Sequence, residues 1–191
     1  EVAEAALRMA CGLQPHEKCP DVERRLAANT AAFAPVLGDD LRTAPLVVLD
    51  LGVASPLVDG DPARNGEPHL GNRIERAMQE AGAHIGVGRY DEARYLYTSP
   101  AFATGDRPTD ETRSVHLGID LFAPPGTPVH APLRGIVAAF ADNAAPQDYG
   151  PVIVLAHRAG DRPFFTLYGH LSRESLERLE VGQWIDRGER F

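Results

Sequence analysis

Cysteine, lysine and long apolar runs are scarce in this sequence, and each shortage excludes a class of protein. Its 191 residues include two cysteines, Cys11 and Cys19, too few for a disulfide-built secreted scaffold, and we expect ordinary thiols. No apolar run reaches the roughly 20 residues of a membrane span, and the best candidate, residues 45–58, contains Asp50. The sequence therefore predicts neither a membrane-spanning protein nor a disulfide-rich one.

Basic residues are also limited in number, and almost all of them are arginine. Lys18 is the only lysine among 19 basic residues, and the formal net charge is -8. An acidic chain of this kind is a poor ligand for nucleic acid or for an anionic membrane surface. No basic segment followed by an apolar stretch opens the chain, so no secretion signal is visible. The sequence starts at Glu1 rather than Met, which is compatible with a signal that has been removed.

The first 110 residues alternate between helical and strand-like patterns. Apolar residues recur at helical spacing in "EVAEAALRMACGL", and Pro20 with Asp21 starts a second helical stretch. Residues 44–53 form a β-branched, apolar run typical of a strand, and Asn72 is a candidate N-cap for a helix in "NRIERAMQEAGAHIG". We expect residues 1–43 to be the tail of a preceding domain or a packing arm, and residues 44–110 to be an α/β linker region.

Beyond residue 110 the pattern changes to short strands separated by turn residues. Gly, Pro, Asn and Asp divide "VHLGIDLF", "TPVHAP", "GIVAAFA", "PVIVLAHR" and "FFTLYGHL". "SRESLERLE" predicts one or two helical turns capped by Ser172, and "VGQWIDRGERF" predicts a further strand with a turn. The fold class is therefore mainly β: an antiparallel sheet or sandwich over residues 111–191, with a mixed α/β region before it.

A histidine and an aspartate with a glycine midway form the first candidate site. On a strand, His116, Gly118 and Asp120 share one face. The opposite, buried face would then hold Leu117, Ile119 and Leu121. Strand positions four apart are roughly 13 Å apart, so His116 and Asp120 can share a metal only if the chain bends at Gly118. The alternatives are half of a zinc site and a solvated or mutually hydrogen-bonded pair.

A second candidate lies in "LYGHLS". His170 is at the end of a predicted strand, two residues after Tyr168. A histidine there can act as a general base or stabilise a developing oxyanion, and the alternative is a structural surface histidine. His130 alternates out of phase with Val129, and His157 closes a predicted strand, where it is expected to hydrogen-bond a neighbouring loop.

Taken in order, "HLGIDLFAPPGTPVHAPLRGIV", "YGPVIVLAH", "FFTLYGHLS" and "VGQWIDRGERF" resemble the lysostaphin-type (LytM-type) zinc metallopeptidases over residues 113–191. The resemblance implies a small antiparallel β fold with zinc in a groove across the sheet. It implies that His116 and Asp120 are zinc ligands and that His170 is the catalytic histidine, with Gly118 and Tyr168 in supporting positions. The implied chemistry is hydrolysis of a cell-wall peptide bond by zinc-bound water.

One element of the family pattern is missing from the printed sequence. The family's third ligand comes from a later His-x-His motif, and no histidines in this sequence have that spacing. We therefore expect an incomplete zinc site and a β domain that is incomplete at its C-terminus. Whether this chain is an active enzyme stays open between a zinc-dependent endopeptidase module and a non-catalytic structural or regulatory module.

A second resemblance concerns "LVVLDLGV", "IGVGRYDEARYLYTSPAF" and "RSVHLGIDLF". They are similar to the middle segment of large bacterial proteins, between a phosphotransferase-like (kinase-fold) domain and a class III, pyridoxal-phosphate aminotransferase domain. That context implies a cytoplasmic location, or a periplasmic or secreted one if a signal has been removed. It implies a peptide substrate and other domains of a larger polypeptide as partners.

A carrier-domain interpretation is excluded by the scarcity of lysine. "PGTPVHAPLRGIV" and "VGQWIDRGERF" also resemble the hairpins of biotinyl and lipoyl carriers. These carriers hold their cofactor on a lysine at a hairpin tip. Lys18 lies far outside the predicted β domain.

Overall fold

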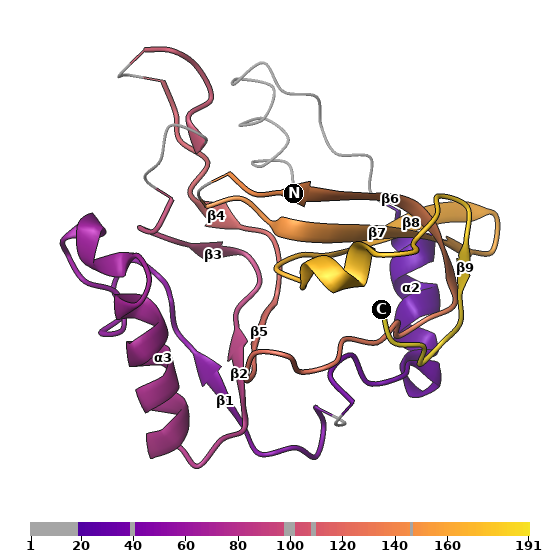
Figure 1. Ribbon diagram of the computed structural model, residues 1–191, viewed down its shortest axis with the longest axis horizontal. Coiled ribbons are helices and arrows are strands. Elements are labelled where there is room, and N and C mark those ends of the chain that lie inside the picture. The colour runs from indigo at the N-terminus through magenta and orange to yellow at the C-terminus, as the bar shows by residue number, and fades with distance from the viewer. Residues whose placement is uncertain (1–18, 39–40, 98–101, 108–109, 146) are drawn as a thin grey trace.

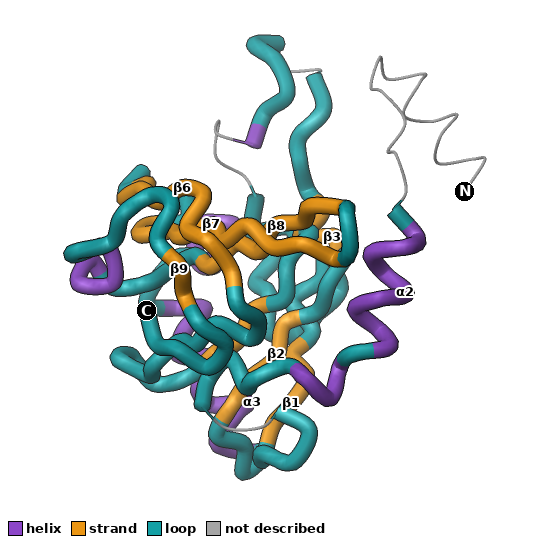
Figure 2. The backbone as a smooth tube through the Cα atoms, turned by 90° about the vertical axis from the view of Figure 1, so that its right-hand side faces the viewer, coloured by secondary structure: helices purple, strands orange, loops and turns teal. Residues whose placement is uncertain are grey.

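Strands dominate the computed structural model of the chain, as the sequence predicts. The structure describes residues 19–38, 41–97, 102–107, 110–145 and 147–191. Its strands form a four-stranded sheet, a three-stranded sheet and a two-stranded sheet. The four-stranded sheet lies above β1 and β2 of the three-stranded sheet in both views (Figures 1 and 2). The expected helix over residues 1–13 falls outside the described residues.

The three-stranded sheet begins as a β–α–β unit. β1 (Leu46–Leu49) runs parallel to β2 (Ile85–Gly88), and α3 (His69–Glu80) connects them and packs on both (Figure 1). β5 (Asp120–Phe122) completes this sheet as the antiparallel partner of β2. The core here consists of Leu49, Leu51 and Ile74, with Met78 and Phe122 among the partly buried side chains around them.

The start of α3 corrects the prediction of an N-cap at Asn72. The helix begins at His69, and Pro68 occupies the N-cap position. The backbone N–H of Asn72 already donates to the carbonyl of Pro68 (3.0 Å), which makes Asn72 an interior residue of the first turn. The carbonyl of Gly66 accepts from the backbone N–H groups of His69 and Leu70, so the first turn begins earlier than the apolar periodicity indicates.

The four-stranded sheet is antiparallel and has the order β8–β7–β6–β9. Its strands are β6 (Gly135–Asn143), β7 (Gly150–Ala159), β8 (Arg162–Tyr168) and β9 (Trp184–Ile185). One face buries Ala131, Val137, Ile153, Leu155 and Ile185. The predicted strand in "TPVHAP" reduces to an isolated bridge between His130 and Arg190, because Pro128 and Pro132 cannot donate ladder hydrogen bonds. The predicted helical turn after Ser172 is the 3-10 helix η4 (Arg173–Leu176).

The segment before β1 packs on the four-stranded sheet. α2 (Pro20–Ala28) contacts β7, with Val22 buried and Pro20 in the first turn. The helical stretch predicted from Pro20 ends at Ala28, and the short 3-10 helix η1 (Thr30–Ala32) follows it. Among the described residues no helix is both long and apolar enough to cross a membrane.

Candidate functional site

The structure brings His116 and Asp120 together by breaking the predicted strand into two. β4 (Val115–His116) pairs with β3 (Glu92–Ala93), whereas Asp120 opens β5 and lies opposite Gly88 of β2. The chain between them bends, and His116 Nε2 lies 3.5 Å from Asp120 Oδ1. Two side chains that a flat strand would hold far apart therefore face each other.

Gly118 makes this approach possible. A Cβ atom at residue 118 would lie 2.9 Å from His116 Nε2 and 3.1 Å from His116 Cε1. Real Cβ atoms essentially never come as close as 2.9 Å, so a side chain at this position would force the imidazole to move. The imidazole thus occupies space that a side chain at position 118 would need.

The bend also overturns the predicted burial of this segment. Leu117 and Ile119 were expected on the buried face, and they are 66% and 63% exposed. The side chains of His116 and Asp120 are the covered ones, at 20% and 25% exposed. Alternation between faces holds only along a continuous strand, and here β4 and β5 belong to different sheets.

Two charged residues that the sequence analysis missed complete the surroundings of Asp120. Arg94 Nη2 donates to Asp120 Oδ2 (2.6 Å), and Arg94 Nε donates to Glu92 Oε2 (3.0 Å). Glu92 Oε1 accepts from Arg89 Nε (2.9 Å) and from the backbone N–H of Leu51 (3.1 Å). In the sequence, Glu92 and Arg94 are two positions apart, as expected for neighbours on one face of an extended segment, but Asp120 lies 26 positions further along the chain.

Electrostatics in this cluster favour the charged forms. Burial pushes the pKa of Glu92 upward, but hydrogen bonds from Arg89, Leu51 and Arg94 outweigh it and hold that pKa below its ordinary value. Burial alone would lower the pKa of Arg94, but the Asp120 carboxylate and Glu92 raise it above its ordinary value. The Glu92 and Arg94 side chains are both almost fully buried, so their opposite charges compensate each other.

His170 lies in a different setting, at the rim of the four-stranded sheet. Its backbone N–H donates to the carbonyl of Tyr149 (2.7 Å), and φ is +57°, in the left-handed region. The His170 ring lies 6.3 Å from the ring of Tyr149, and the His116 ring lies 6.4 Å from that of Tyr97. Each of the two histidines thus has a tyrosine ring beside it.

Those two tyrosines are linked by the loop between β6 and β7. Gln147 Nε2 donates to the carbonyl of Leu96 (3.2 Å), which ties the segment before Tyr149 to the segment before Tyr97. Burial raises the pKa of Tyr97, and the neighbouring Arg94 opposes that shift. The loop connects the surroundings of the two histidines, although the structure shows no direct contact between them.

Tyr168, the other expected supporting residue, belongs to the core rather than to the surface beside His170. Its ring packs edge-on against Phe191 at 4.8 Å, next to the buried cluster of the four-stranded sheet. Burial raises the pKa of its hydroxyl, whose oxygen has no hydrogen-bond partner among the described residues. This position suits a packing role.

Two further histidines differ in how their rings are held, because both ring nitrogens of His157 are hydrogen-bonded whereas His130 Nδ1 is buried with no hydrogen-bond partner among the described residues. His157 is buried, with Nδ1 2.9 Å from the carbonyl of Arg134 and Nε2 2.8 Å from Thr166 Oγ1. Both ring nitrogens are therefore committed, as a loop-bonding histidine would be. His130 donates its backbone N–H to the carbonyl of Val36 (2.8 Å).

The donor atoms of His116 and Asp120 match the geometry of a zinc site in part. Two ligands of a tetrahedral zinc ion are about 3.4 Å apart, and the spacing between His116 Nε2 and Asp120 Oδ1 is 3.5 Å. The pair fits two positions of such a site. His116 Nδ1 is buried without a hydrogen-bond partner in the described chain, so it lacks the acceptor that usually orients a ligating imidazole. No group of three His, Cys, Asp or Glu side chains in the described part of the chain is arranged to hold a metal ion.

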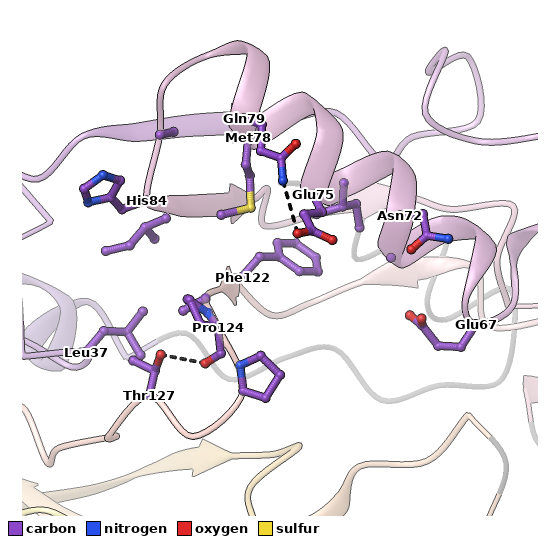
Figure 3. A pocket seen from close by; sticks show the side chains of 16 residues that line it. Leu37, Glu67, Asn72, Glu75, Met78, Gln79, His84, Phe122, Pro124 and Thr127 are labelled. Atoms are coloured by element: carbon purple, nitrogen blue, oxygen red, sulfur yellow. Dashed lines mark hydrogen bonds between the residues drawn. The ribbon is translucent and has the colours of Figure 1, made fainter.

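A separate cleft of about 840 Å³ opens between α3 and the turn after β5 (Figure 3). Its floor is apolar, with Met78 and Phe122, while Glu67, Glu75 and His84 lie along its rim. None of the predicted site residues lines it. The cleft is therefore distinct from the His116–Asp120 pair.

Comparison with known protein families gives a match in the β-rich part of the chain. Residues 114–191 match the family model described as Peptidase family M23. No curated protein and no solved structure matches the chain. The matched stretch contains His116, Asp120 and His170, whereas Glu92 and Arg94 lie outside it. The match covers less than half of the chain, and it supports a peptidase-like module over residues 114–191.

Proposed function

We propose that residues 114–191 form a zinc-dependent peptide-hydrolysing module, with His116 Nε2 and Asp120 Oδ1 as metal donors and His170 as the catalytic histidine. The observation that carries this proposal is the 3.5 Å spacing of the two donor atoms within a stretch that matches peptidase family M23. Bound zinc would act as a Lewis acid and lower the pKa of a bound water. A catalytic zinc site usually has three protein ligands, whereas this pair supplies two. A further donor besides His116 and Asp120 is therefore needed.

Individual residues of this chain would have separate roles in the proposed module. Gly118 leaves room for the His116 imidazole, so the two donor atoms stay at ligand spacing. His170 is exposed at the rim of the sheet, where its imidazole can exchange a proton with a peptide lying in front of it. The substrate class we propose is a cell-wall peptide or a related peptide.

The wider context is also part of this proposal. The resemblance of residues 46–53, 85–102 and 113–122 to the middle segment of phosphotransferase and aminotransferase proteins supports a module inside a larger bacterial polypeptide. Such a protein would be cytoplasmic, or periplasmic or secreted if a signal is removed. In the cytoplasm the substrate would be a wall precursor or another small peptide.

A non-catalytic structural or regulatory module is the second candidate. It is favoured by the engagement of Asp120 Oδ2 with Arg94, together with the two-donor set. In this case the peptidase fold would serve contacts with other domains of the polypeptide. The metal site would then be a remnant.

Zinc content decides between the two. The dialysed 191-residue chain is analysed by elemental analysis beside His116→Ala, with His84→Ala as a control histidine in the separate cleft. About one zinc per chain, lost only in His116→Ala, is expected for the peptidase. Amine release from purified peptidoglycan or its soluble peptides should then stop in His170→Ala while zinc is retained. A chain without zinc that releases no amine would support the non-catalytic module.

A further inference from the structure

The contact between Arg94 and Asp120 is built into the fold. Arg94 directly follows β3, its backbone N–H donates to the carbonyl of Ser114 (2.7 Å), and its side chain is 6% exposed. Gly88 leaves room for this contact, because a Cβ atom there would lie 2.8 Å from Asp120 Oδ2 and 3.2 Å from Arg94 Nη2. Glu92 holds the other end of the guanidinium through Nε.

The two oxygens of the Asp120 carboxylate have different partners in this arrangement. Oδ2 accepts from Arg94, and Oδ1 faces His116 Nε2. A guanidinium stays protonated at every accessible pH, so Arg94 is a permanent cation at this carboxylate. A divalent ion on Oδ1 would lie beside that cation, and the two like charges would repel each other in a partly buried setting.

We propose that Arg94 is a resident cation that competes with a divalent metal for Asp120 and so weakens metal binding at the His116–Asp120 pair. This inference rests on the metal site proposed above. Arg94 and Glu92 lie outside the stretch that matches the peptidase family. The α/β region that precedes the peptidase-like module therefore supplies the group that controls its metal affinity.

The test is the affinity of the full chain for Zn²⁺, measured by competition with a chromophoric chelator at fixed pH and ionic strength. Arg94→Met removes the competitor. The double variant Glu92→Gln/Arg94→Met removes one positive and one negative charge, which keeps the net charge unchanged. Arg89→Met is the matched control, because Arg89 bonds the same Glu92 but not Asp120. Each variant is first shown to be folded by circular dichroism.

We expect zinc to bind roughly 10- to 100-fold more tightly in both Arg94 variants, because the like-charge repulsion at Asp120 is removed, and within about twofold of the original chain in Arg89→Met. Adding Asp120→Asn to Arg94→Met should abolish the gain, which a merely structural role of Arg94 would not require. If Arg94→Met fails to fold, the double variant decides, because it leaves no buried Glu92 charge without its partner.

The outcomes separate this inference from the proposed function. A chain that binds no zinc, with variants that do, upholds the competition and refutes the metallopeptidase role of the unaltered chain. A chain that binds zinc as tightly as its Arg94 variants overturns the competition and leaves the proposed function intact. Absence of zinc binding in every variant overturns both. A gain confined to the single variant assigns the effect to net charge and also overturns the competition.

Discussion

Replacing Arg94 by methionine should destabilise the folded chain by about 3 to 5 kcal/mol, the usual cost of removing one partner of a buried ion pair. Arg94 bonds Glu92 at 3.0 Å and Asp120 at 2.6 Å. Methionine retains much of the side-chain volume, so the loss is mainly electrostatic. Glu92 would keep its bonds from Arg89 and Leu51, which places the expected value nearer the lower limit.

Substitution of Glu92, the buried partner of Arg94, shows how strongly the two residues are coupled. Glu92→Gln keeps the acceptor for the Leu51 N–H and removes the charge, with an expected cost of about 1.5 to 3 kcal/mol, the strength of a charge-assisted hydrogen bond. In the double variant Glu92→Gln/Arg94→Met no buried charge of this pair remains. We therefore expect the double variant to cost less than the sum of the single ones, with a coupling free energy of about 2 kcal/mol.

Urea unfolding followed by circular dichroism measures these free energies. For a chain of this size the Arg94→Met loss corresponds to a fall in the thermal midpoint of roughly 6 to 20 °C. Arg89→Met is the control, because Arg89 is 49% exposed and its ion pairs are screened by solvent, so the midpoint should change little. A loss below about 1 kcal/mol in Arg94→Met, or strictly additive single variants, would show that Arg94 does not compensate the buried charge of Glu92.

Three further predictions concern the site and its surroundings. Gly118→Ala should displace the His116 imidazole and weaken zinc binding about tenfold or more, while Gly66→Ala, where a Cβ meets no atom within 4 Å, should leave the affinity unchanged. Chelator competition compares the two. Because the pKa of Glu92 is depressed, the stability carried by its ion pairs is complete above about pH 4.3 and is lost as pH falls through the lower, folded-state pKa. Urea unfolding from pH 7 to pH 3 should show a smaller acid loss in Glu92→Gln, and equal losses would contradict this. His170→Ala should lower peptide hydrolysis by about 100-fold or more without loss of zinc, and a joint loss of both would show that His170 binds the metal.

Much of the fold follows from local pattern. The β-branched runs at residues 46–49, 135–143 and 150–159 are strands, as predicted, because a run of such residues fits a half-buried sheet in almost any context. The ends of helices and strands, and the short elements, follow less directly from local sequence pattern. Whether "TPVHAP" pairs along a full ladder depends on partners far away in the chain, and two prolines remove its donors.

The proximity of His116 and Asp120 could be foreseen because Gly118 provides a bend between two potential ligands. The exposure of Leu117 and Ile119 could not, since it depends on β4 and β5 joining different sheets. Nor could the role of Arg94 be foreseen, because its partner Asp120 becomes a neighbour only when β5 pairs with β2. Local patterns reveal candidate donors, whereas the charges that govern them are set by tertiary pairing.

The position of Asp120 explains why residues outside the peptidase-like module matter to its site. Asp120 begins β5, whose hydrogen-bonded partner is β2 of the β1–α3–β2 unit, and its carboxylate bonds Arg94, which follows β3. His116, four residues earlier, pairs with Glu92 on β3. Both candidate ligands are thus held by backbone pairing to the region before residue 114. A shift of β2 or β3 would change the spacing between the two donor atoms, and the α/β region is consequently a structural part of the candidate metal site.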